Sequence, residues 1–242
     1  MIPSGRWRLL FLGAALACAG RVHANTAVEP VPRDAGWVKR HEGFVQIAHG
    51  GNVDLLFLGD SITDNWRNRG KAVWDQNYGS LHAANFGISG DRTQHVLWRM
   101  DHGELDGIHP KVVVLMIGTN NTGLERDHPV ARNTPDEAIA GVTAVVRELR
   151  VKLPDSQILL LSLLPRADKV GPKPGDIRDI NAAIAKLDDG KAVHYLDLGA
   201  KFQNPDGTFV PGALGPDFLH PAAKGYEIWA EAMRAPLAQF LK

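Results

Sequence analysis

The feature that most constrains the fold of this chain is the alternation of short apolar runs with segments of helical period. Five runs rich in Val, Ile and Leu occupy residues 54–59, 83–88, 112–118, 157–164 and 193–198. Strands with continuous apolar sequence are typical of a parallel sheet that is buried on both faces. The pattern therefore predicts an α/β fold of three layers, in which helices cover both faces of a five-stranded parallel sheet.

Two of the intervening segments carry helix signals. Thr134, Pro135 and Glu137 have the spacing of a capping box with proline at the first helical position. The apolar stripe that follows is Ile139, Val142, Val146 and Leu149. A second stripe with the same period is Ile177, Ile180, Ile184 and Leu187. Gly190 offers this second helix a left-handed stop, so both segments are predicted to be crossover helices.

Two further helices are expected at the ends of the domain. An early helix carries Trp37, His41 and Phe44 and is expected to pack on the sheet. A last helix follows Pro221, and Pro236 is expected to kink or end it because proline lacks the backbone N–H that a helix interior needs. No internal repeat interrupts this order.

Length and charge indicate one domain, without the electrostatic field of a nucleic-acid-binding protein. The 242 residues suffice for one substantial core. Lys plus Arg and Asp plus Glu number 27 each, so no field of one sign would attract nucleic acid or an anionic membrane. Small neutral or weakly charged partners are expected.

The first 24 residues read as a signal peptide, and residues 25–242 as the single domain. Arg6 and Arg8 precede an apolar stretch at 9–20, which ends near the small-residue site at 22–24. A membrane anchor is the alternative, although the stretch is shorter than the ~20 apolar residues of a span. Cys18 is the only cysteine, so the mature chain would have no disulfide or thiol nucleophile, and it is expected to be secreted or periplasmic, without stable membrane insertion.

Polar residues follow three of the predicted strands where each strand ends. The segments are 59–61, 87–90 and 118–120. Residues at the carboxyl ends of parallel strands converge on one crevice, and the 217–220 segment, reached from the fifth strand, can join them there. Four segments far apart in sequence are thus expected to meet.

These segments supply the groups that ester cleavage requires. Ser61 is the candidate nucleophile at the start of a helix, His220 the base, and Asp217 the carboxylate that orients the imidazole. The backbone N–H groups of Ser61 and Gly90 and the side-chain amide of Asn120 are the candidate oxyanion donors. Gly90 suits this role because it has no Cβ to hold substrate away.

Several neighbouring residues have simpler interpretations. Asp60 is expected to order the loop through backbone hydrogen bonds, and Asn121 to be a turn residue. Trp66, Trp74 and Trp98 are expected to pack in the core or at its rim, with a sugar platform as the alternative. The other histidines show no paired metal-ligand spacing, so a metal-dependent hydrolase is disfavoured.

The four blocks 59–63, 87–90, 118–121 and 217–221 resemble, in order and spacing, those of the SGNH (GDSL-type) hydrolases. Within that family the stretch 85–99 is similar to the catalytic subunits of platelet-activating factor acetylhydrolase. The resemblance implies a flavodoxin-like sheet of strand order 2-1-3-4-5, Ser61, Asp217 and His220 as a triad, and Ser61, Gly90 and Asn120 as oxyanion donors. It implies no cofactor. Ile62 stands where the family usually has Leu.

The sequence therefore predicts a serine esterase that works through an acyl-enzyme on short-chain esters, acetyl above all. An exported enzyme of this kind is expected to act on O-acetylated carbohydrates, with acetylated phospholipids or aryl esters as alternatives. A non-catalytic glycan- or ligand-binding protein on the same fold is the alternative of another class. Pairing into a homodimer, as in the apparent relatives, is left open.

Overall fold

Five parallel strands form one sheet in the order β2-β1-β3-β4-β5, which is the order that the resemblance to the SGNH hydrolases implied. The structure is a computed structural model, and the residues it describes are 24–125, 132–173 and 175–242. The predicted signal peptide thus lies outside the described residues, except for Ala24. The strands are β1 Leu55–Gly59, β2 Ala83–Gly87, β3 Val112–Met116, β4 Gln157–Leu161 and β5 Val193–Leu196.

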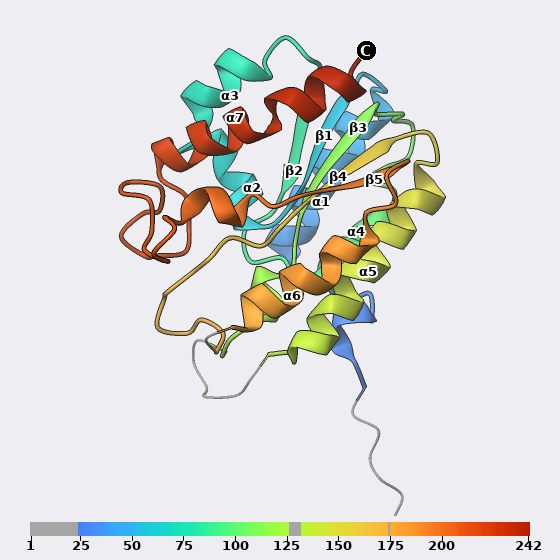
Figure 1. The fold of residues 1–242 in the computed structure, drawn as a ribbon. Helices are drawn as coiled ribbons and strands as arrows, with labels where there is room; N and C mark the ends of the chain where they lie inside the picture. Colours follow the sequence, from blue (N-terminus) through green and yellow to red (C-terminus); the bar gives the residue numbers. More distant parts are fainter. Residues whose placement is uncertain (1–23, 126–131, 174) are drawn as a thin grey trace, which may run out of the picture.

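Helices cover both faces of the sheet and complete the three layers (Figure 1). One face packs against α2 Ser61–Asp64, α3 Lys71–Asn77 and α7 Ala223–Phe240. The other packs against α1 Ala35–His49, α4 Thr93–Asp101, α5 Pro135–Lys152 and α6 Asp176–Ile184. Among the described helices, none combines the length and apolar character that crossing a membrane requires.

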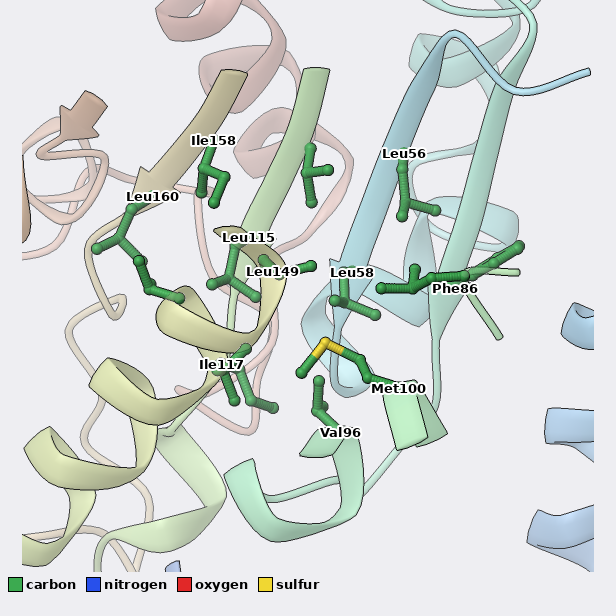
Figure 2. Packing of buried hydrophobic residues seen from close by; sticks show 14 of the residues in the cluster. Leu56, Leu58, Phe86, Val96, Met100, Leu115, Ile117, Leu149, Ile158 and Leu160 are labelled. Atoms are coloured by element: carbon green, nitrogen blue, oxygen red, sulfur yellow. The ribbon is translucent and has the colours of Figure 1, made fainter. Parts of the chain in front are cut away.

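Alternate residues of the strands supply the two halves of the core. Leu56 and Leu58 of β1 belong to the half that packs on the helices α1, α4 and α5, and Figure 2 shows Leu58 beside Met100 of α4. Leu55 and Phe57 point to the opposite half, which contains the buried Trp66, Tyr226 and Trp229. Full burial of one such side chain stabilises the fold by about 1.5–3 kcal/mol. The sheet is therefore a rigid base for the loops at its carboxyl edge.

The predicted capping box begins α5. Thr134 Oγ1 accepts a hydrogen bond from the Glu137 amide at 3.2 Å, and the Glu137 carboxylate accepts one from the Thr134 amide at 2.8 Å. The second crossover helix, α6, ends at Ile184 and continues as a 3-10 turn to Leu187. Gly190 has the expected positive φ of 63° but lies beyond that turn.

Pro236 was expected to kink or end the last helix, and the expectation that it ends the helix is wrong. Helix α7 continues through Pro236 to Phe240. The inward-facing residues Met233 and Leu237 lie on either side of the proline and are both buried. Packing of this apolar face on the sheet outweighs the one hydrogen bond that proline cannot donate.

Candidate active site

The three residues predicted to act together meet at the carboxyl end of β1. Ser61 is the first residue of α2, directly after the strand, and His220 and Asp217 lie in the loop before α7. His220 Nε2 lies 2.9 Å from Ser61 Oγ, and His220 Nδ1 lies 2.9 Å from Asp217 Oδ2. A hydrogen-bonded chain therefore runs from the hydroxyl through the imidazole to the carboxylate, although 159 positions separate the serine from the histidine.

The loop that carries Asp217 and His220 is held by its own hydrogen bonds. Asp217 Oδ1 accepts from the amides of Leu219 and His220, at 3.2 and 3.0 Å. The Gly215 amide donates to the His220 carbonyl at 2.8 Å. Phe218 adopts a positive φ of 50°, uncommon for a residue with a Cβ, and this turn directs Asp217 and His220 to the same side. The loop is thus pre-organised around the carboxylate.

Asp217 is ionised throughout the neutral range. Partial burial opposes ionisation, but hydrogen bonds from the His220 amide and imidazole and from the Leu219 amide lower the pKa of Asp217 to about 2. Arg69 Nη2, a partly exposed cation, lies 3.8 Å from Asp217 Oδ2. An anionic Asp217 favours the tautomer with hydrogen on Nδ1, which leaves Nε2 able to accept a proton from Ser61.

Asp60 orders the turn before Ser61, in agreement with its interpretation from the sequence. It is the N-cap of α2, and its Oδ1 accepts from the Ile62 amide at 2.9 Å. Oδ2 is buried without a hydrogen-bond partner among the described residues. Burial raises the pKa of Asp60 to about 7. Below about pH 7 the group next to the serine is therefore mostly neutral.

The raised pKa of Asp60 predicts that the substitution Asp60→Asn becomes more stabilising as the pH rises. The folded chain binds the carboxyl proton of Asp60 more tightly than the unfolded chain does. This proton therefore contributes fully to the free energy of unfolding below pH 4, and its contribution is lost as the pH rises through about 7. The free energy of unfolding falls by at most about 4 kcal/mol through this loss. Asparagine keeps the acceptor for Ile62 and does not ionise. Urea unfolding of both proteins at pH 4, 6 and 8 measures the difference, and a pH-independent difference would contradict the assignment.

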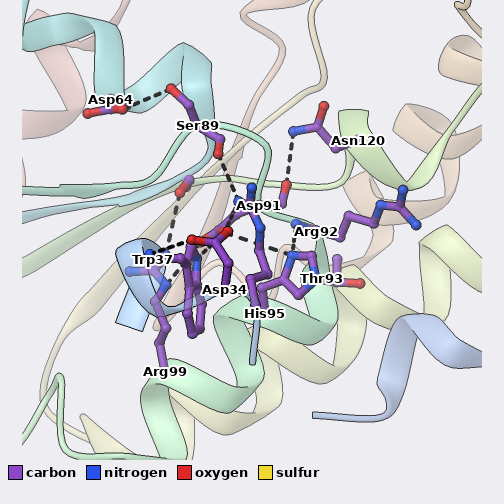
Figure 3. A network of polar contacts seen from close by, with 12 residues as sticks. Asp34, Trp37, Asp64, Ser89, Asp91, Arg92, Thr93, His95, Arg99 and Asn120 are labelled. Carbon is purple, nitrogen blue, oxygen red and sulfur yellow. Dashed lines mark hydrogen bonds and ion pairs between the residues drawn. The ribbon is translucent and has the colours of Figure 1, made fainter. Parts of the chain in front are cut away.

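The candidate oxyanion donors lie on the loops after β2 and β3. Gly90 has a φ of 84°, which favours glycine, and Asn120 lies in a 3-10 turn at Thr119–Asn121. Asn120 Nδ2 donates to the Asp91 carbonyl at 2.9 Å, which joins the two loops (Figure 3). Ser89 Oγ donates to Asp64 of α2 at 2.9 Å, so the Gly90 loop is also attached to the helix of Ser61.

Sequence reasoning missed the buried network that holds these loops. Asp91 Oδ1 accepts from Trp37 Nε1 at 2.7 Å, and Asp91 Oδ2 lies 3.0 Å from Arg99 Nε (Figure 3). Arg99 also donates to Glu104 at 2.5 Å, and all three charged side chains are fully buried. Asp91 directly follows Gly90, and Asp91 and Arg99 both lie in the stretch 85–99 that carried the resemblance, but nothing in the sequence pairs them. Its partners come from α1 and α4 and are visible only in the fold.

Other residues have packing roles. Asn121 is fully buried, accepts from the Thr93 amide at 3.0 Å and donates to Gln94 at 3.0 Å, so it fixes the start of α4 rather than serving only as a turn residue. Trp66 is 1% exposed and packs in the core, with Trp74 beside it. Within the described ranges, no group of three His, Cys, Asp or Glu side chains is placed to hold a metal.

Known proteins similar to this chain include human platelet-activating factor acetylhydrolase IB subunit alpha1. The two sequences are 33% identical over 217 residues, which cover 89% of each chain. A solved structure of a putative platelet activating factor from Streptococcus pneumonia has a TM-score of 0.66 at 22% identity and covers 83% of this chain and 92% of its own. At that identity it shows the fold.

A solved mutant of Axe2, an acetyl-xylooligosaccharide esterase from Geobacillus Stearmophilus, is also similar in fold. Its TM-score is 0.59 at 24% identity, and the match covers 74% of this chain and 92% of that one. The sequence profile of the GDSL-like lipase/acylhydrolase family matches residues 57–228, most of the chain. On the profile and the acetylhydrolase relatives, the chain belongs to the GDSL-like lipase/acylhydrolase family and is an ester hydrolase.

Proposed function

We propose that the chain hydrolyses short-chain carboxylic esters, acetyl esters above all, through an acyl-enzyme on Ser61. The observation that carries the proposal is the unbroken chain of hydrogen bonds from Ser61 through His220 to Asp217. Such a chain allows the imidazole to remove the serine proton as the oxygen attacks, while the carboxylate stabilises the imidazolium that forms.

The reaction has two halves. Ser61 Oγ attacks the ester carbonyl and its proton passes to His220 Nε2; the carbon–alcohol bond then breaks and the alcohol leaves with that proton. Water attacks the acyl-enzyme while the same imidazole takes its proton; the bond between the acyl carbon and Ser61 Oγ then breaks, the acid is released, and the proton returns from His220 to the serine oxygen. The Ser61 and Gly90 amides and the Asn120 side chain are the proposed donors to the oxyanion in both halves.

The preference for acetyl groups is supported by what the similar proteins are named for. Both an acetylhydrolase subunit and an acetyl-xylooligosaccharide esterase are among them. In the described sequence no long apolar segment stands between the strands and helices as a lid for a fatty chain. The acyl group is therefore proposed to be short.

A series of p-nitrophenyl esters tests the acyl preference. The acetate and butyrate are expected to be cleaved with a higher kcat/KM than the palmitate, because no long apolar segment among the described residues could cover a fatty chain. Detergent-matched controls with enzyme omitted correct for the solubility of the palmitate. A higher kcat/KM for the palmitate would overturn the preference.

We propose that the alcohol portion of the ester is a carbohydrate, so that the substrate is an O-acetylated carbohydrate. We propose that the segment 1–24 directs export and that the enzyme encounters this substrate outside the cytoplasm. The apolar stretch behind Arg6 and Arg8 supports export. The similarity to Axe2 supports the carbohydrate. Acetylated xylan fragments, acetylated phospholipids and aryl acetates compared on one preparation discriminate among the alternatives. If the acetylated phospholipid were cleaved faster than every sugar ester, the carbohydrate proposal would be wrong.

A further inference from the structure

A pocket of about 370 Å³ lies beside the proposed oxyanion donors and is rich in arginine. Gly90, Asn120 and Leu219 line the side nearest the active site, and Leu219 directly precedes His220. The charged side chains of the lining are Arg33, Arg92, Arg132, Arg166 and Asp168. The pocket therefore places guanidinium groups next to the proposed oxyanion donors.

Two of these arginines are attached to the oxyanion loops themselves. Arg33 Nη1 donates to the Ser89 carbonyl at 2.8 Å, and both of its terminal nitrogens would lie 3.2 Å from a Cβ built on Gly90. Arg132 Nη1 donates to the Asn120 carbonyl at 3.2 Å. The cationic groups and the proposed oxyanion donors consequently belong to one rigid arrangement.

The arginines share their carboxylate partners on one side of the pocket. Arg92 and Arg132 both pair with Glu125, the latter at 3.4 Å between Nε and Oε2. Arg166 pairs with Asp168 at 2.6 Å. Desolvation and the charges of Arg92 and Arg166 lower the pKa of Arg132 against the opposing effect of Glu125. The positive charges are thus close enough to repel one another.

On the Arg33 side of the pocket, two arginines likewise share one carboxylate. Asp91 pairs with Arg33 at 3.1 Å and with Arg99 at 3.0 Å, and Arg99 reaches Glu104. His95 lies 3.8 Å from Asp91 but adds no charge near neutral pH, because burial and nearby arginines lower its pKa to about 3. Among the described residues, these ion pairs join five guanidinium groups to four carboxylates.

We propose that this pocket is a subsite for an anionic group, a carboxylate or a phosphate, on the alcohol portion of the ester. The inference rests on the proposed function and specifies its substrate class. Arg33 and Arg92 each use one terminal nitrogen on a protein partner, and their second terminal nitrogens form no hydrogen bond with another described residue. Paired N–H groups of arginine bind planar or tetrahedral oxyanions well. Such a ligand supplies the negative charge that the cluster lacks.

The test compares 4-acetoxybenzoate with its neutral methyl ester, each kcat/KM being divided by the rate of alkaline hydrolysis of the same compound. The wild-type protein is expected to prefer the anion by about tenfold, the effect of one hydrogen bond to a charged group. Arg92→Gln is expected to lower this anion-to-neutral ratio at least about fivefold, and Arg92→Lys to restore only part of it, because lysine keeps the charge but not the paired N–H groups. Glu125→Gln removes a competing carboxylate and is expected to raise the ratio.

Arg234→Gln is the matched control. It removes the same charge from the exposed surface of α7, outside the pocket, and should leave the ratio unchanged. The subsite would be overturned if the wild-type protein showed no preference between the anion and its methyl ester. It would also be overturned if both Arg92→Gln and Glu125→Gln left the anion-to-neutral ratio unchanged. Failure of the proposed function has a different signature, since hydrolysis of both esters would then survive Ser61→Ala. An acetylated uronic acid and an acetylated glycerophosphate, assayed in parallel, distinguish the two sources of the anion.

Discussion

Replacing Ser61 with alanine is expected to lower kcat for p-nitrophenyl acetate by about 10⁴- to 10⁶-fold. Ser61 Oγ is the atom that His220 Nε2 contacts, at 2.9 Å, so its loss leaves the base with no proton to remove. Water cannot take its place at the same rate, because it lacks the fixed position that the strand-to-helix turn gives the hydroxyl. Asp60 and the cap of α2 do not depend on this hydroxyl, so the fold should persist.

The effect is measured with purified protein whose thermal unfolding matches that of the wild type. Ser80→Ala serves as the control, because Ser80 is exposed and lies outside the strands and helices. A fluorophosphonate should label the wild-type and Ser80→Ala proteins at one site each, and the Ser61→Ala protein at none. Retention of more than about 1% of wild-type kcat in a folded Ser61→Ala protein would exclude Ser61 as the nucleophile.

Much of the fold could be predicted because the strands β1 to β4 are almost entirely buried. The run 112–118, for example, contains only apolar residues and glycine, and its first five residues form β3. The helix starting at Pro135 was predictable because its cap uses only local residues. The end of α7 was not predictable from the sequence. A proline indicates a helix end only from its local effect on the backbone, whereas the burial of Met233 and Leu237 depends on the whole sheet.

Part of the candidate site could likewise be predicted from the sequence, and part could not. Residues that follow strands, such as Ser61 and Gly90, could be placed because parallel topology brings strand ends together. The arginine pocket could not, because Arg33 and Arg166 come from irregular segments more than a hundred residues apart with no periodicity. Nor does a sequence show that Asp91 is buried between two arginines. Ion-pair partners are set by tertiary packing.

The substitution Asp217→Asn is expected to reverse the hydrogen bond to His220 and thereby inactivate the base. Asp217 Oδ1 accepts from two backbone amides, those of Leu219 and His220, and this position therefore requires an acceptor. The carbonyl oxygen of asparagine would take it, so that the NH₂ group faces Nδ1 where Asp217 Oδ2 now lies at 2.9 Å. The imidazole must then accept at Nδ1 and carry its proton on Nε2.

A protonated Nε2 cannot remove the proton of Ser61, so kcat is expected to fall by about 10³- to 10⁴-fold, with a much smaller change in KM because Asp217 orients the base rather than binding the ester. Steady-state kinetics on p-nitrophenyl acetate measure the effect, and loss of a downfield Nδ1–H proton resonance reports the changed tautomer. Asp206→Asn is the matched control, since Asp206 also accepts from a backbone amide, that of Thr208, on an exposed turn of the preceding loop. If Asp217→Asn lowered kcat by less than about tenfold, the carboxylate would have no role in selecting the tautomer.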